Sequence, residues 1–236
     1  MTTRRTFQQL IWPPNEIFRD LAENWGARAS SILLSHVWEG CDALKKKRLI
    51  QIGGLTQDNL SIERSITQTL VPEIRKAMPP TSPFQVEHGA FEFETLESSA
   101  AQPPEYDISF VMYSNQRLIW PIEAKVLETD GTLAEYIKEI NDNYLTCRYG
   151  PFTGEGAMLA YLLNGEPSKV FKNIEKKLNC KLIHHADFSN RDHKTSDHQR
   201  CVPKGKPYPR DFRCHHLVLG VGNSHIGESS TPLQRN

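Results

Sequence analysis

The sequence of 236 residues has no run of apolar residues approaching the roughly 18 that a membrane-spanning helix needs. Its first residues, MTTRRTFQQLIWPP, include arginines but no continuous apolar segment, so we expect no secretory signal peptide. Internal repeats and low-complexity tracts are also missing. These absences argue against membrane, exported and repeat proteins, and they favour a soluble cytoplasmic protein.

An excess of either charge is missing too, because 28 lysines and arginines balance 28 aspartates and glutamates. A polyanionic partner would therefore have to bind a local basic patch. Three basic runs could form one, unless they are solvated faces: Lys45 to Arg48, Lys172 to Lys177, and Lys204 to Arg213. Hydrophobic residues make up 38% of the chain and charged residues 24%, which predicts a folded protein.

Closely spaced cysteine pairs are absent. The five cysteines are widely spread and odd in number, so we expect free thiols in a reducing cytosol, with no disulfide and no zinc. A weaker alternative is a small zinc-stabilised interaction module. Four ligands for it could come from an irregularly spaced set: Cys180, His184, His185, Cys201, Cys214 and His215. Alternation along the last strand places Cys214 and His216 on one face and His215 on the other.

Periodicity predicts an α/β protein. The clearest helix spans 56–78, where Ile62, Ile66, Leu70 and Ile74 recur every four residues behind a cap at Thr56 or Asp58. The other expected elements are helices at 15–25, 30–49, 132–150 and 168–179, and strands at 84–97, 106–114, 117–127, 157–163 and 212–222, with 179–210 mainly loop around a candidate short strand at 180–185. In the strand at 84–97, Phe91 and Phe93 alternate with acidic residues, as in a half-buried strand. This order predicts a central mixed β-sheet flanked by helices, with residues 1–50 as an N-terminal helical extension and 51–236 as the main domain.

One strand ends in an unexpected way. The apolar run RLIWPIEAK, from Arg117 to Lys125, finishes with two opposite charges, Glu123 and Lys125. Residues two apart on a strand share a face. If this strand forms a hairpin with YDISFVMY, Asp107 at the start of one strand lies beside Glu123 and Lys125 near the end of the other. Two carboxylates and an amine would then meet at one end of the sheet.

Such a cluster suits phosphodiester hydrolysis. Carboxylate oxygens are ligands for Mg²⁺, with Mn²⁺ as the alternative, and this ion keeps several waters while taking one or two protein carboxylates. A lysine beside it can orient the attacking water or stabilise negative charge in the transition state. The simpler alternative is a solvated strand end with a weak ion pair.

The stretch YDISF, followed on the next strand by PIEAK, resembles the PD-(D/E)xK nuclease superfamily, which has the restriction-endonuclease-like fold. The resemblance covers roughly residues 56 to 165. Tyr106 stands where the family loosely keeps a proline. The family also places a glutamate on the helix before the sheet; Glu63 matches that place, and Glu73 and Asp58 on the same helix are alternatives.

The resemblance implies a metal-dependent endonuclease. Its metal ligands would be Asp107, Glu123, Glu63 and the main-chain carbonyl of Ala124, and Lys125 would serve the attacking water. Polar or aromatic residues of the following helix would face the site, the candidates being Tyr136, Glu139, Tyr144 and Arg148.

DNA is favoured over RNA on family grounds alone. The expected setting is an effector of anti-phage defence or restriction, with a partner subunit or a homodimer as further expectations. The alternative from another class is a catalytically inactive module of the same fold that binds nucleic acid or a protein as a scaffold.

Overall fold

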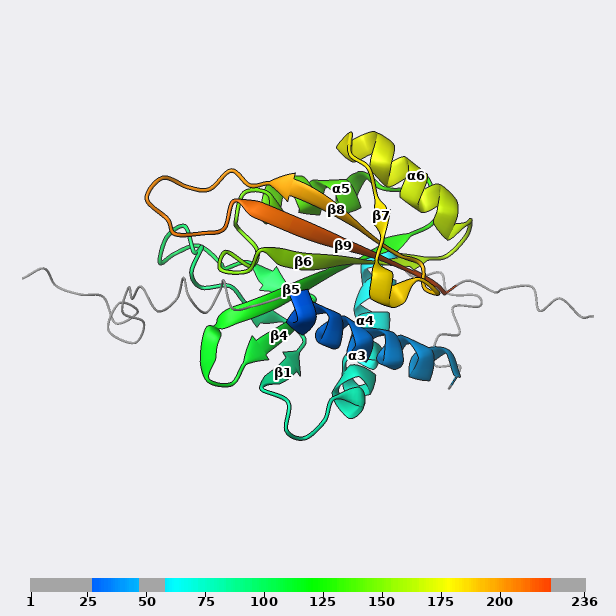
Figure 1. The fold of residues 1–236 in the computed structure, drawn as a ribbon, viewed down its shortest axis with the longest axis horizontal. Coiled ribbons are helices and arrows are strands. Elements are labelled where there is room, and N and C mark those ends of the chain that lie inside the picture. The colour runs from blue at the N-terminus through cyan, green and yellow to red at the C-terminus, as the bar shows by residue number, and fades with distance from the viewer. Residues whose placement is uncertain (1–26, 47–57, 222–236) are drawn as a thin grey trace, which may run out of the picture.

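The structure, a computed structural model, describes residues 27–46 and 58–221 (Figure 1). Its helices are α3 (Ala27–Lys46), α4 (Asn59–Ala77), α5 (Ala134–Glu139), the π-helical turn η1 (Ile140–Tyr144), α6 (Pro167–Leu178) and the short 3₁₀ turn η2 (Ala186–Phe188). Its strands are β1 (Phe84–Glu87), β2 (Ala90–Phe91), β3 (Glu105–Tyr106), β4 (Ile108–Met112), β5 (Asn115–Leu127), β6 (Glu155–Leu162), β7 (Ile183–His184), β8 (His193–Gln199) and β9 (Asp211–Gly220).

Seven strands form one mixed sheet in the order β1-β4-β5-β6-β9-β8-β7, and β2 and β3 form a separate two-stranded sheet. The three central strands β5, β6 and β9 run parallel, while the strands at each side join antiparallel. From α4 onward, the sheet strands β1, β4 and β5 follow the helix, with β4 antiparallel to both β1 and β5, and α5 and η1 then lead into β6, which is parallel to β5.

Helices cover both faces of the sheet, with α3 and α4 on one side and α5 and α6 on the other (Figure 1). Strand β5 alternates between the two cores, since Trp120, Ile122 and Ala124 pack with α3 and α4, while Ile119 and Leu127 pack with α5 and α6. A central strand that is buried on both faces carries apolar residues at nearly every position. Charged residues inside such a strand must find partners in the protein.

Helix α4 follows its predicted pattern. Asp58 caps its first turn by accepting a hydrogen bond from the N–H of Ser61 at 2.9 Å, and its apolar stripe is buried against the sheet. Helix α3 shares one core with α4 and the sheet through these buried residues: Leu33, Leu34, Val37, Trp38, Cys41 and Leu44. The helix expected over 15–25 and the expected boundary of the N-terminal extension at residue 50 lie outside the described residues.

The predicted α/β fold with a central mixed sheet flanked by helices is confirmed. None of the helices within 27–46 and 58–221 is long and apolar enough to cross a membrane.

Three local predictions were wrong. Strand β8 lies within the segment expected to be mainly loop. Its buried residues His193, Thr195 and Ser196 are polar, so the sequence has no apolar pattern there that would indicate a strand. The helix expected over 132–150 ends after a short α-helix and a π-helical turn. Phe91 and Phe93 are 37% and 44% exposed, whereas the intervening Glu92 is 3% exposed. The expected inward and outward residues are therefore exchanged in this segment.

Candidate active site

The candidate site lies where β5 extends beyond its neighbour β4. The pairing of these strands ends at Ile108 and Ile122, but β5 continues to Leu127. Two carboxylates accept hydrogen bonds from the main-chain N–H groups left open there. Asp107 Oδ2 accepts from Ala124 at 2.8 Å, and Glu63 Oε2 accepts from Val126 at 3.1 Å. The open edge of β5 thus fixes the acidic residue immediately before β4 and one acidic residue of α4.

The amine of Lys125 lies among these carboxylates. Its Nζ is 2.7 Å from Glu123 Oε1 and 2.8 Å from the carbonyl oxygen of Ala124. The same nitrogen is 3.4 Å from Glu63 Oε1 and 3.7 Å from Asp107 Oδ2. The structure therefore brings together all five groups that the sequence and the resemblance indicated.

Burial and neighbouring charges shift the protonation of this cluster. Burial raises the pKa of Glu123 well above its ordinary value, the negative charge of Asp107 raises it further, and Lys125 opposes both. Burial also raises the pKa of Glu63, against the attraction of Lys125. Burial alone would lower the pKa of Lys125, but the three carboxylates outweigh it and hold the amine charged. The amine thus offsets part of the repulsion among the acids.

The residues present fit a hard divalent cation. Glu123 Oε2 is buried and has no hydrogen-bond partner among the described residues, and the Asp107 side chain is the most exposed of the three acids, at 27%. Within 27–46 and 58–221 there is no group of three or more His, Cys, Asp or Glu side chains that could hold a metal ion by themselves. Mg²⁺ commonly takes only one or two carboxylates and fills its remaining positions with water and substrate oxygens. Asp107, Glu123 and the carbonyl of Ala124 provide that smaller set.

The other acids of α4 do not reach this cluster. Asp58 caps the helix, and Glu73 pairs with Lys76 at 2.7 Å. The assignment of Glu63 among the three acids of α4 therefore matches the geometry.

Only part of the following helix faces the cluster. The Tyr136 hydroxyl is hydrogen-bonded to Nδ1 of His216 at 2.9 Å, and Arg148 pairs with Glu97 at 3.1 Å, so neither side chain is directed at the carboxylates. Glu139 lies close enough that its charge helps to raise the pKa of Glu123. The buried Tyr144 donates a hydrogen bond to the carbonyl of Ala157 at 2.8 Å from the π-helical turn, a feature frequent at functional sites.

Sequence reasoning missed Tyr149. This buried ring packs edge-on against Tyr106 with centroids 5.0 Å apart, and its hydroxyl donates to the carbonyl of Glu105 at 3.2 Å. Burial raises the pKa of Tyr149, and the charges of Glu123, Glu139 and Asp107 raise it further, which places the ring beside the acidic cluster. The expected helix over 132–150 included Tyr149, whereas in the structure this residue lies beyond η1 and outside any helix, so helical periodicity gave no signal for its position.

The cysteine and histidine set is divided between the two faces of the sheet, and within it the rings of His185 and His215 lie together, with centroids 5.4 Å apart. All five cysteines are free thiols. As predicted, Cys214 packs with the α5 and α6 core, while His215 lies on the opposite face against Trp120. The Trp38 indole N–H donates to His193 Nδ1 at 3.3 Å, and His193 Nε2 is 3.1 Å from His215 Nδ1. The indole can only donate, so His193 Nδ1 accepts its hydrogen bond and the proton of the neutral His193 ring is on Nε2. Nε2 then donates to His215 Nδ1, and His193 has no free lone pair for zinc.

The basic runs are partly neutralised by acidic residues. Lys206 lies 3.4 Å from Glu94, and Arg213 lies 2.8 Å from Asp197. The run from Lys172 to Lys177 lies on α6, and Lys45 and Lys46 end α3, whereas residues 47 and 48 are outside the described part of the chain.

Comparisons with known proteins add no assignment, since no family model, curated protein or solved structure matches this chain.

Proposed function

We propose that the chain is a metal-dependent nuclease of the restriction-endonuclease-like type, with its active site at the open end of β5. The observation that carries the proposal is the convergence of four side chains from three elements. Asp107, Glu123 and Glu63 all lie within 3.7 Å of the Lys125 amine. A single surface ion pair contributes little and needs no such convergence.

Two further features support the proposal. Asp107 immediately precedes β4, and β4 pairs antiparallel with β5, the strand that carries Glu123 and Lys125. The helix before the sheet supplies Glu63, and a second helix leads into a parallel strand, β6. These features concern position only, and the activity itself is inferred from the chemistry of the groups.

Each residue has a distinct role in the proposed reaction. Asp107, Glu123 and the carbonyl of Ala124 would hold Mg²⁺, or Mn²⁺ in its place. When bound, the ion supplies Lewis acidity toward a phosphoryl oxygen and a bound water. Lys125 orients the attacking water and stabilises the negative charge that develops on the phosphoryl oxygens. Glu63 supports the site by holding the N–H of Val126 and the amine of Lys125.

The nature of the substrate and setting follows from the resemblance alone. It favours DNA over RNA, a cytoplasmic effector of anti-phage defence or restriction, and assembly with a partner subunit or as a homodimer.

The direct test incubates purified protein with plasmid, linear and single-stranded DNA and with RNA, with Mg²⁺, with Mn²⁺ and with a chelator. We expect cleavage of at least one DNA substrate that needs the metal and is lost in Lys125→Ala. Absence of metal-dependent cleavage of every substrate would contradict the proposal.

Two observations favour the scaffold alternative. The Lys125 amine already pairs with the acids, and no three-ligand metal group exists in the described residues. Nucleic-acid binding without cleavage, unchanged by metal, would support that alternative.

A further inference from the structure

Asp107 is the single residue that separates β3 from β4, and these two strands belong to different sheets. Strand β3 ends at Tyr106 in the two-stranded sheet, and β4 begins at Ile108 in the seven-stranded sheet. Ile108 is fixed by its pairing with Ile122. The direction of the Asp107 carboxylate therefore depends on how firmly the chain is held at Tyr106.

The hydroxyl group of Tyr106 donates one hydrogen bond and accepts another. The buried hydroxyl donates a hydrogen bond to Glu92 Oε2 at 2.7 Å and accepts one from the N–H of Gly150 at 2.9 Å. The main-chain carbonyl of Tyr106 accepts from the N–H of Gly89 at 3.1 Å. The residue next to Asp107 is thus fixed through its side chain and its backbone.

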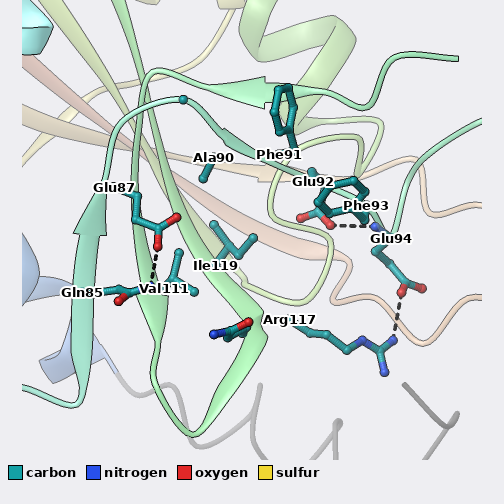
Figure 2. Close-up of a pocket in the computed structure, with 12 residues that line it drawn as sticks. Gln85, Glu87, Ala90, Phe91, Glu92, Phe93, Glu94, Val111, Arg117 and Ile119 are labelled. Carbon is teal, nitrogen blue, oxygen red and sulfur yellow. Dashed lines mark hydrogen bonds and ion pairs between the residues drawn. The ribbon is translucent and has the colours of Figure 1, made fainter. Parts of the chain in front are cut away.

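Glu92 is a fixed acceptor for this hydroxyl. Its carboxyl group is turned inward between the exposed Phe91 and Phe93, and its other oxygen accepts from the N–H of Glu94 at 2.9 Å (Figure 2). Glu92 lines a pocket of about 390 Å³ whose wall also includes Val111 and Ile119. Both oxygens of this buried carboxyl are therefore in use.

Gly150 is equally fixed on the other side. Its φ of +50° suits glycine, and a Cβ there would lie 2.9 Å from the Pro121 ring, two residues before Glu123. The buried guanidinium of Arg200 donates from Nη1 to the carbonyls of Gly150 at 3.0 Å and Thr153 at 2.8 Å. The turn that binds the Tyr106 hydroxyl is thus anchored to β5 and to the segment after β8.

We propose that Tyr106 is a positioning residue for Asp107, acting through the hydrogen bonds of its hydroxyl to Glu92 and Gly150. The catalytic meaning of this role rests on the proposed nuclease function. The structural part of this role does not depend on that function, because the hydrogen bond from the N–H of Ala124 to the Asp107 carboxylate involves no metal. Groups behind a metal ligand are often as important as the ligand itself, since they fix its direction.

The test compares Tyr106→Phe with Tyr136→Phe. Both tyrosines are buried in the same core, and both hydroxyls make a buried side-chain hydrogen bond, but that of Tyr136 goes to His216. Amide hydrogen exchange of Ala124, followed by NMR in the absence of metal, reports the Asp107 bond directly. The Mg²⁺ concentration for half-maximal single-turnover cleavage provides the second readout.

We expect Tyr106→Phe to accelerate exchange at Ala124 by about 10-fold or more, the scale of a lost hydrogen bond to a charged group. The Mg²⁺ midpoint should rise by about 10-fold, the lower end for groups that support a metal ligand. Tyr136→Phe should change neither. Equal effects in the two variants, or unchanged exchange in Tyr106→Phe, would overturn the proposal.

A second pair of variants serves if Tyr106→Phe does not fold. Glu92→Gln keeps an acceptor for the hydroxyl and should preserve slow exchange at Ala124, whereas Glu92→Leu removes the acceptor and should accelerate it. Fast exchange in both, or slow exchange in both, would contradict the proposed role. If the variants show the expected difference in exchange at Ala124 but the wild type shows no metal-dependent cleavage, the positioning role of Tyr106 stands and the nuclease function is refuted.

Discussion

The amine of Lys125 lies 2.7 Å from Oε1 of Glu123, two residues earlier on the same strand, and both side chains are largely buried. Isolated buried charges are costly, and a close pair offsets that cost only in part. Here the amine also contacts the Ala124 carbonyl, and Glu63 and Asp107 lie on its other sides. The end of β5 is therefore arranged around a positive charge before any metal is considered.

This arrangement predicts a pH-dependent loss of stability in Lys125→Met. Above pH 7 the variant leaves the carboxylates without their cation, and the free energy of unfolding should fall by about 3 kcal/mol or more. The loss should shrink toward pH 4.5, because the raised pKa values of Glu123 and Glu63 let these groups take up protons. Chemical denaturation at both pH values measures this, and an equal loss at both would contradict the account.

Cleavage by Lys125→Ala and Asp107→Ala should differ in metal dependence. Lys125→Ala keeps the proposed ligands, so its single-turnover rate should fall by roughly 10²-fold at every Mg²⁺ concentration. Asp107→Ala weakens metal binding, so added Mg²⁺ should restore part of its rate. A Mg²⁺ titration of wild type and both variants decides this. Near-wild-type cleavage by Lys125→Ala would show that the charges of PIEAK serve only the strand end.

The third prediction separates Glu63 from the other buried acid of its helix. Glu63→Gln removes a charge from the cluster and should lower the cleavage rate by about 10-fold or more, as for other groups that support a metal site. Glu73→Gln changes a buried acid that pairs with Lys76 and should leave the rate unchanged. Thermal unfolding of both variants controls for stability. A rate loss shared by both would mean that the effect is structural.

The sequence contained enough information to predict the convergence at β5. Apolar runs marked the buried strands, and alternation placed Glu123 and Lys125 on one face. Only the resemblance could favour Glu63 over Glu73 and Asp58, because the apolar pattern of α4 does not show which of these acids lies near Lys125. The distance between Lys125 and Glu63 resolves this position.

What the sequence could not predict lies in polar residues that are buried by tertiary hydrogen bonds. Strand β8 carries His193 and Ser196 where an apolar residue would mark a strand, and Glu92 is buried between two phenylalanines that point outward. Propensity rules assign such residues to the surface. Their partners, including Tyr106, come from distant parts of the chain, so no local pattern predicts them.

The last prediction concerns the pH dependence that Glu92 gives to stability. Burial raises the pKa of Glu92 from 4.5 to about 7, although the hydrogen bonds from Tyr106 and Glu94 oppose the rise. The folded protein therefore holds this proton more tightly than the unfolded chain does. The resulting stability is fully present below pH 4.5 and is lost as the pH rises to about 7.

A shift from 4.5 to about 7 corresponds to about 3 kcal/mol across that range. Glu92→Gln cannot ionise, so relative to this variant the wild type should lose about that free energy of unfolding between pH 4.5 and pH 7. Subtracting the two profiles cancels the contributions of Glu123, Glu63 and the buried histidines, which both proteins share. Glu135→Gln, at an exposed position on α5, controls for the loss of a carboxyl group. Parallel profiles for wild type and Glu92→Gln, measured by chemical denaturation, would mean that Glu92 ionises as freely in the folded protein as in the unfolded chain.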